Sequence, residues 1–124
     1  MELPEIIAAY IDAYNARDVD AMLFCLGEDI VFRNIAGGEV NAATDGKAAF
    51  ADLARVGVEA FSARRQRVTD AIVLTGRAML VVDYAATVAA DLPNGWTKGQ
   101  ELAFEGRSYF EWRDGKITLI VDEM

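Results

Sequence analysis

The chain has no histidine among its 124 residues, one cysteine and two prolines. Without histidine it lacks the commonest general base near neutral pH and the commonest metal ligand, so serine–histidine and cysteine–histidine hydrolysis are excluded. Acid–base chemistry must then come from carboxylates, tyrosines or lysines with shifted pKa values. The single Cys25 excludes an intrachain disulfide and a cysteine metal cluster, and it fits a reduced compartment. We expect neither a metal nor a cofactor.

Long apolar runs and an excess of positive charge are also absent. No run is long enough to span a bilayer, and the first residues, MELPEII, are acidic where a secretory signal needs positive charge. Twenty acidic against twelve basic residues give a net charge of −8, which disfavours binding to nucleic acid. We interpret Arg64, Arg65 and Arg67 as complementing the C-terminal dipole of a preceding helix. We therefore expect a soluble, cytoplasmic protein with no membrane or nucleic-acid partner.

The composition is that of one globular domain over residues 1–124. Apolar residues make up 53% of the chain and charged residues 26%, and a chain of 124 residues can bury one substantial core.

The first half of the sequence has helical periodicity. Apolar residues at helical spacing predict a helix over 3–16 and a second, shorter helix over 18–26, the latter capped at its first residue and stopped by a glycine. A first strand is predicted at 30–32, and the glycine-bearing stretch 37–43 is predicted to be a loop. An apolar face over 45–63 predicts a third helix.

The second half has the pattern of strands joined by tight turns. Predicted strands cover 68–74, 78–89, 101–112 and 117–121, with turn residues between them. Consecutive hairpins predict an antiparallel meander. Helices followed by such a sheet indicate an α+β fold and disfavour a doubly wound nucleotide-binding fold.

Four segments carry a resemblance to a known superfamily: AAYIDAYNARDVDAM, GEDIVFRN, DGKAAF and SYFEWRDGKITLIVD. Together they resemble the nuclear transport factor two-like, or SnoaL-like, superfamily, over nearly the whole chain from Tyr10 to Asp122. The resemblance implies a cone-shaped, strongly bent antiparallel sheet wrapped around three N-terminal helices, with one apolar pocket. Many unrelated functions share this fold, so it does not fix an activity.

Limonene epoxide hydrolases are one instructive group within this superfamily. By resemblance, Asn34 takes the position of their water-holding asparagine, and Asp83 and Asp122 take the positions of their two aspartates. Phe32 stands where they have a tyrosine, and Val81 stands where they have an arginine. Arg107 could replace that arginine only if its side chain points inward.

Ketosteroid isomerases are the other instructive group. Tyr10 matches their oxyanion-hole tyrosine, but Asn34 stands in place of their proton-shuttling aspartate and Ser108 in place of their protonated aspartic acid. These differences argue against a steroid isomerase mechanism. Polyketide cyclases with a histidine-assisted site are also disfavoured, because the histidine is missing.

The preferred hypothesis is an enzyme that binds a small apolar metabolite and performs carboxylate-assisted hydrolysis, as epoxide hydrolases do, or isomerisation. Asp83 and Asp122 are the predicted acid–base pair, and Asn34 is predicted to hold a water. The alternative is a non-catalytic ligand-binding or dimerisation module. The predicted substrate-binding residues are mostly aromatic: Tyr10, Tyr14, Phe32, Phe50, Phe61, Ser108, Phe110 and Trp112.

Each of these residues also has a structural interpretation. Asp83 could point outward or form a salt bridge, Asn34 could bond to its own loop, and the aromatic residues could be core. If Asp83 faces the pocket, alternation places the apolar row from Ala78 to Ala90 on the outside of the sheet. Such a row predicts a homodimer through the outer sheet face.

Overall fold

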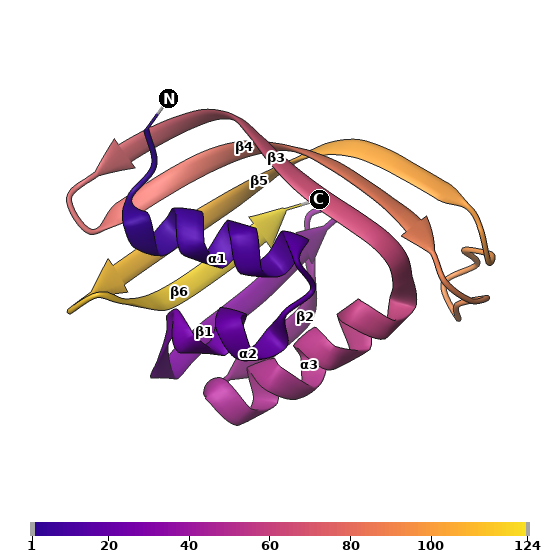
Figure 1. Cartoon of the computed structure of the whole chain (residues 1–124), viewed down its shortest axis with the longest axis horizontal. Helices are drawn as coiled ribbons and strands as arrows, with labels where there is room; N and C mark the ends of the chain where they lie inside the picture. Colours follow the sequence, from indigo (N-terminus) through magenta and orange to yellow (C-terminus); the bar gives the residue numbers. More distant parts are fainter. Residues whose placement is uncertain (1, 124) are drawn as a thin grey trace.

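Three helices lie against one face of a six-stranded sheet that curves around them (Figure 1). This computed structural model describes residues 2–123. The elements are α1 Glu5–Asn15, α2 Val19–Phe24, β1 Leu26–Ala36, β2 Glu39–Asp45, α3 Lys47–Ala60, β3 Phe61–Leu74, β4 Arg77–Val88, β5 Glu101–Arg113 and β6 Lys116–Glu123. The α+β fold and its bent sheet are confirmed. None of the described helices is long and apolar enough to cross a membrane.

The sheet is mixed, which corrects the prediction of a purely antiparallel sheet. The strand order is β2-β1-β6-β5-β4-β3, and all neighbours are antiparallel except β1 and β6. In that parallel pair Phe32 lies opposite Ile120 and Asn34 opposite Asp122. Parallel neighbours need a long connection, and here α3 and the β3–β5 meander separate β1 from β6 in the sequence. The pairing therefore places the C-terminal ends of β1 and β6 side by side.

Strand β1 begins at Leu26 instead of residue 30, so Gly27 lies in a strand and does not end α2, which ends at Phe24. Two further boundaries differ from the sequence-based prediction. The segment 37–43, expected to be a loop, contains most of β2, which forms a hairpin with β1 around Gly37 and Gly38. Both glycines have positive φ (60° and 80°), which a non-glycine residue rarely adopts. The third helix ends at Ala60 instead of residue 63, and β3 begins at once with Phe61. The sheet is therefore longer at both points than the pattern indicated.

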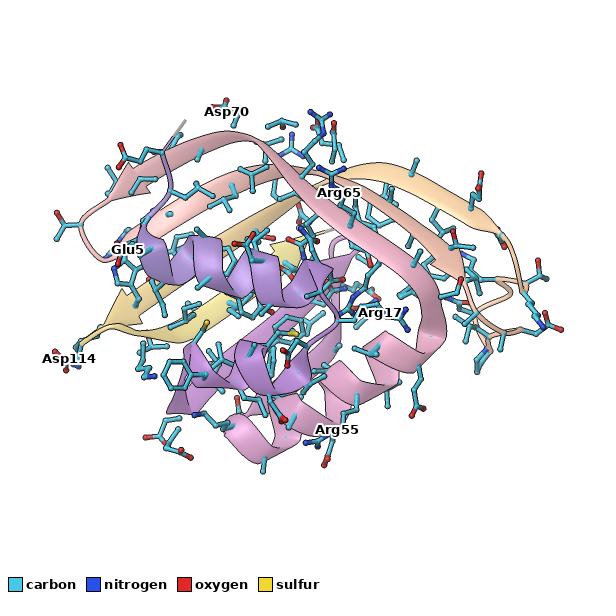
Figure 2. All side chains as sticks on the ribbon, in the orientation of Figure 1. Glu5, Arg17, Arg55, Arg65, Asp70 and Asp114 are labelled. Carbon is cyan, nitrogen blue, oxygen red and sulfur yellow. The ribbon has the colours of Figure 1, made fainter. Side chains whose placement is uncertain are left out.

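Arg17 connects the turn between α1 and α2 to the C-terminal end of α3 through two hydrogen bonds. It has φ 58°, and its guanidinium donates to the Ser62 carbonyl at 2.7 Å and to the Val58 carbonyl at 3.1 Å. Figure 2 shows Arg17 between the two segments. Arg17 therefore takes the role at the C-terminus of α3 that we assigned to the basic cluster, and that assignment was wrong. Arg64 instead lies on the inner face of β3, and Arg65 and Arg67 lie on its outer face.

The faces of β4 are the reverse of those assumed for the predicted dimer. The apolar row Ala78, Leu80, Val82, Tyr84, Ala86 and Val88 is buried. Within this row Leu80 and Val82 belong to the same core as Ile7 of α1 and Phe110 of β5. The row is therefore core and cannot be a dimer surface. An outer-face homodimer stays a prediction, but it would have to use the odd-numbered residues of β4.

Candidate functional site

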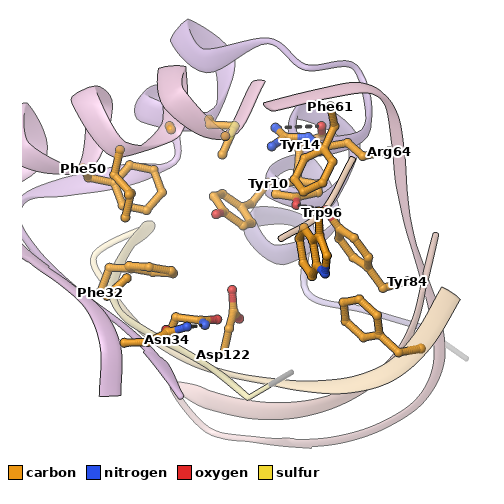
Figure 3. A pocket seen from close by; sticks show the side chains of 17 residues that line it. Tyr10, Tyr14, Phe32, Asn34, Phe50, Phe61, Arg64, Tyr84, Trp96 and Asp122 are labelled. Atoms are coloured by element: carbon orange, nitrogen blue, oxygen red, sulfur yellow. Dashed lines mark hydrogen bonds between the residues drawn. The ribbon is translucent and has the colours of Figure 1, made fainter. Parts of the chain in front are cut away.

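A cavity of about 340 Å³ lies between the concave face of the sheet and the helices (Figure 3). Its walls are mostly apolar and aromatic, and its polar groups are few. The predicted residues Tyr10, Tyr14, Phe32, Phe50 and Phe61 all line it, as the sequence analysis expected. A concave apolar site with a few convergent polar groups is the usual form of a small-molecule site.

Asp122 is the carboxylate of this cavity. It lies near the end of β6, directly opposite Ser108 of β5 in the antiparallel register, and the Ser108 hydroxyl donates to Asp122 Oδ1 at 2.7 Å. Burial raises the pKa of the Asp122 carboxyl to about 6, against the opposing effect of the Ser108 hydrogen bond. A carboxyl with such a pKa can both accept and return a proton near neutral pH.

Asn34 lies beside Asp122 on the cavity wall (Figure 3), as the β1–β6 register requires. Its Nδ2 donates to Oδ1 of Asn41 on β2 at 2.7 Å. This bond fixes the amide and leaves the Asn34 oxygen free to accept. Asn41 was missed by sequence reasoning because its strand was read as a loop.

Tyr10 of α1 faces the same space from the helical side (Figure 3). Its ring packs edge-on against Phe110 at 5.8 Å between centroids, and its hydroxyl has no hydrogen-bond partner among residues 2–123. Burial, with a smaller contribution from the Asp122 charge, raises the pKa of Tyr10 well above its ordinary value. The phenol therefore stays protonated and can donate to a ligand oxygen.

Tyr14, Tyr84 and Arg64 form a second polar group in the cavity. The hydroxyls of Tyr14 and Tyr84 are 2.8 Å apart, and the Arg64 guanidinium lies 3.7 Å from the centroid of the Tyr14 ring. Burial is the main cause that raises the pKa of both tyrosines, so both remain phenols. Sequence reasoning missed Arg64 and Tyr84. Only the register of β3 with β4 locates them. Arg64 of β3 is paired with the buried Ala86 of β4, so its side chain lies on the inner face of the sheet.

Aromatic pairs form much of the wall. Phe32 meets Phe50 edge-on at 5.6 Å, and Tyr84 stacks on Phe104 at 5.0 Å between centroids. Trp96, from the loop between β4 and β5, packs on Phe61 at 6.2 Å. Trp96 and Phe104 were not among the predicted substrate-binding residues.

Three predicted binding residues do not line the cavity. Phe110 is 1% exposed and belongs to the core, and Trp112 packs at the edge of that core. Both predictions were wrong because an aromatic residue on an inner-facing strand position can fill the core as well as a pocket. Ser108 is buried behind Asp122 and can act only through that carboxyl.

Asp83 lies on the opposite face of the sheet, so its predicted place in the pocket is wrong. Its carboxylate is paired with Arg67 of β3 at 2.5 Å, and the Asp83 side chain is 48% exposed. Alternation along β4 puts even-numbered residues inside and Asp83 outside. Arg107 also faces outward, paired with Glu105. Asp83 and Asp122 therefore cannot act together in one cavity.

The polar groups that line the cavity are thus proton donors and acceptors. Within residues 2–123 no three histidine, cysteine, aspartate or glutamate side chains lie close enough together to bind a metal ion. The acid–base groups are Asp122 and the phenols, with Asn34 as an amide and Arg64 as a cation.

A family model for SnoaL-like domains matches residues 7–120. The chain belongs to the SnoaL-like family. This membership and the cavity support a small-molecule binding or catalytic role. A comparison with curated proteins gives no match.

Solved structures similar to this SnoaL-like chain include two proposed polyketide cyclases. The protein from Pseudomonas putida is 28% identical, with a TM-score of 0.77 over 98% of this chain and 90% of that one. The protein from Silicibacter is 28% identical, with a TM-score of 0.76 over 95% and 85%. An LEH-like epoxide hydrolase of Mycobacterium tuberculosis is 20% identical, with a TM-score of 0.75 over 95% and 78%, and supports the fold alone.

Proposed function

We propose that this SnoaL-like chain is an enzyme that moves a proton within a small apolar carbonyl compound, with Asp122 as the base. One observation carries the proposal. A carboxyl group with a pKa of about 6 lines an apolar cavity that also holds the free hydroxyl of Tyr10. A base poised near neutral pH and a phenol donor are the two groups that enolisation requires.

The reaction follows from the position of these groups. Ionised Asp122 takes a proton from the carbon next to the carbonyl, and the electron pair of the C–H bond forms an enolate. Tyr10 donates a hydrogen bond to the enolate oxygen. In a substrate with a C=C bond next to that carbon, the enolate extends over the double bond, and Asp122 returns the proton to the far carbon of that bond, which completes an isomerisation. Ser108 holds Oδ1 of Asp122 during both transfers and so orients the carboxyl. A single carboxylate is enough for this sequence, and Asp83 is not needed.

Hydrolysis of an epoxide is the second candidate, and the pairing of Asn34 with Asp122 favours it. The two side chains lie on paired positions of β1 and β6 and both line the cavity. A water between them would donate one proton to Asp122 and a hydrogen bond to the Asn34 oxygen. The water oxygen would attack an epoxide carbon while Tyr10 donates a hydrogen bond to the opening oxygen, and the proton taken up by Asp122 would pass to that oxygen, so both side chains end as they began.

The test follows deuterium and oxygen isotopes in two substrate classes. Cyclohex-3-enone in D₂O should isomerise to the conjugated enone, whose absorbance rises, and should gain deuterium by mass spectrometry. Styrene oxide in H₂¹⁸O should give labelled diol if hydrolysis is the reaction. Asp122→Asn should abolish either activity and Asp83→Asn should not. Saturable binding without turnover of either class would instead support the non-catalytic module.

A further inference from the structure

Arg64 is a buried cation that the proposed reaction does not use. Only 8% of the residue is exposed, and it extends from β3 to line the cavity. Nη2 donates to the Tyr14 carbonyl at a long 3.4 Å, and Nε is buried with no hydrogen-bond partner. A guanidinium has five N–H donors, so most of its donors have no protein acceptor here.

In the part of the chain that the structure describes, no carboxylate forms an ion pair with Arg64. Its strand neighbour Arg67, by contrast, is paired with Asp83. Asp122 is held by Ser108 at a separate part of the cavity (Figure 3). A buried charge without a partner is costly, and proteins keep such groups mainly where a ligand supplies the partner.

The surroundings of Arg64 hold it at the cavity. Its guanidinium stacks on the Tyr14 ring, whose hydroxyl is bonded to that of Tyr84. On the other side α3 has Gly57, where a Cβ atom would lie 3.3 Å from Nη1 of Arg64. Glycine within a helix is unfavourable relative to alanine, so the absence of a side chain at Gly57 is consistent with room kept for the guanidinium.

We propose that Arg64 binds the carboxylate of the ligand, and that the ligands of this cavity are aromatic or alicyclic monocarboxylic acids. The carboxylate supplies the missing counter-ion, and a planar guanidinium matches it well. The Tyr84–Phe104 stack gives an aromatic wall for the ring of the ligand. A single cation among aromatic side chains suits one negative charge better than a phosphate dianion. The substrate of the proposed reaction is then an apolar ring compound that carries one carboxylate besides its reacting carbonyl group. The inference rests on the proposed function only for placing the reacting carbon near Asp122.

The test compares 2-naphthoate with 2-naphthamide, a neutral molecule of the same shape. In both probes the ring carbon bonded to the carbonyl group carries no hydrogen, so Asp122 has no proton to remove and the titration reports binding alone. Calorimetry, or quenching of Trp96 fluorescence, should show naphthoate binding at least about tenfold tighter, as expected for a charge-assisted contact. If the isotope experiment shows no role for Asp122, the preference for naphthoate over naphthamide is still expected, so the two proposals can fail separately.

Variants separate Arg64 from the general charge of the protein. Arg64→Met should remove the preference for naphthoate, whereas Arg65→Met, which deletes the same charge from the exposed face of the same strand, should keep it. Gly57→Ala, which leaves the arginine in place but crowds it, should weaken naphthoate binding more than naphthamide binding. Naphthoate should raise the melting temperature of the unaltered protein and of Arg65→Met, but not that of Arg64→Met.

Three results would overturn the proposal. They are equal or weaker binding of naphthoate, a preference that survives Arg64→Met, and no saturable binding of either probe. A large loss of stability in Arg64→Met, with naphthoate preference unaltered in Gly57→Ala, would make Arg64 a structural residue.

Discussion

The two faces of β3–β5 treat their polar residues in opposite ways. On the outer face Arg67 is paired with Asp83, and Arg107 with Glu105, all with substantial exposure to solvent. On the inner face Arg64 has no counter-ion, and Asp122 on the neighbouring strand β6 has only a serine. These four outer-face charges are in contact with water and form two ion pairs. The charged groups on the inner face, Arg64 and Asp122, have little contact with water and no ion-pair partner among residues 2–123, so they can interact with a ligand.

The comparison also separates burial from function. The inward-facing residues of β4 are apolar because they pack on the helices. Tyr84 is the exception in this strand, and it lines the cavity. Polar residues on the inner face therefore mark the site more reliably than an aspartate flanked by apolar neighbours. Asp83 has such neighbours on both sides and still faces solvent.

Replacing Asp122 by asparagine, compared with the same replacement at Asp83, gives the largest expected effect. Asp122→Asn should lower turnover about 10³-fold, because it removes the base, and Asp83→Asn should change it less than about twofold. Initial rates with cyclohex-3-enone and styrene oxide measure both variants. Equal losses in the two variants would break the distinction between the faces.

Core residues of β4 give the next largest effect. Leu80 is 0% exposed and its neighbour Met79 is 40% exposed on the other face. Leu80→Ala should cost about 3 kcal/mol of unfolding free energy because it leaves a cavity, and Met79→Ala about 0.5 kcal/mol. Urea denaturation followed by circular dichroism compares them, and similar costs would mean that the faces are misassigned.

The raised pKa of Asp122 makes a smaller change in stability with a definite sign. The folded protein holds this proton more tightly than the unfolded chain, so the contribution of Asp122 to stability is greatest at low pH and falls as pH rises from about 4 to about 6. Above pH 6 Asp122→Asn should be more stable than the unaltered protein by about 2 kcal/mol. Urea denaturation at pH 4 and pH 8 gives the two values. A variant that is less stable at pH 8 would show that the ionised carboxyl stabilises the fold.

A homodimer through the outer face is the weakest expectation, and we propose it with corrected residues. Ile72 and Met79 are paired positions on β3 and β4, 64% and 40% exposed. A second copy would bury such apolar side chains. Met79→Arg should then lower self-association measured by sedimentation velocity at micromolar concentration, with Val56→Arg on α3 as the matched control. A protein that is monomeric before substitution would refute the dimer.

The sequence predicted the local elements of this fold well. Apolar spacing located α1 and α2, and turn residues located the β3–β6 hairpins, because both depend on neighbouring residues. The parallel pairing of β1 with β6 depends on segments about ninety residues apart, which no local pattern shows. β2 was missed because the two glycines before it and its own small and polar residues resemble a loop.

The candidate site was predicted in part, for a related reason. Tyr10, Asn34 and Asp122 were found through the resemblance, which places them on known elements. Asp83 was assigned to the wrong face, because a strand with apolar residues on both faces does not show which one meets the helices. Arg64 was read as a helix-end charge, because only the register of β3 with β4 shows that it points inward.

Titration of the aspartate carboxyl groups by ¹³C NMR tests the central claim most directly. Spectra of the unaltered protein and of Asp122→Asn assign the Asp122 resonance by its disappearance. We expect a midpoint near pH 6 for this carboxyl, because burial in the cavity disfavours its charge. A midpoint at or below about 3.9, the value of an unperturbed aspartate, would show that Asp122 is fully solvated or paired and would contradict its role as the base.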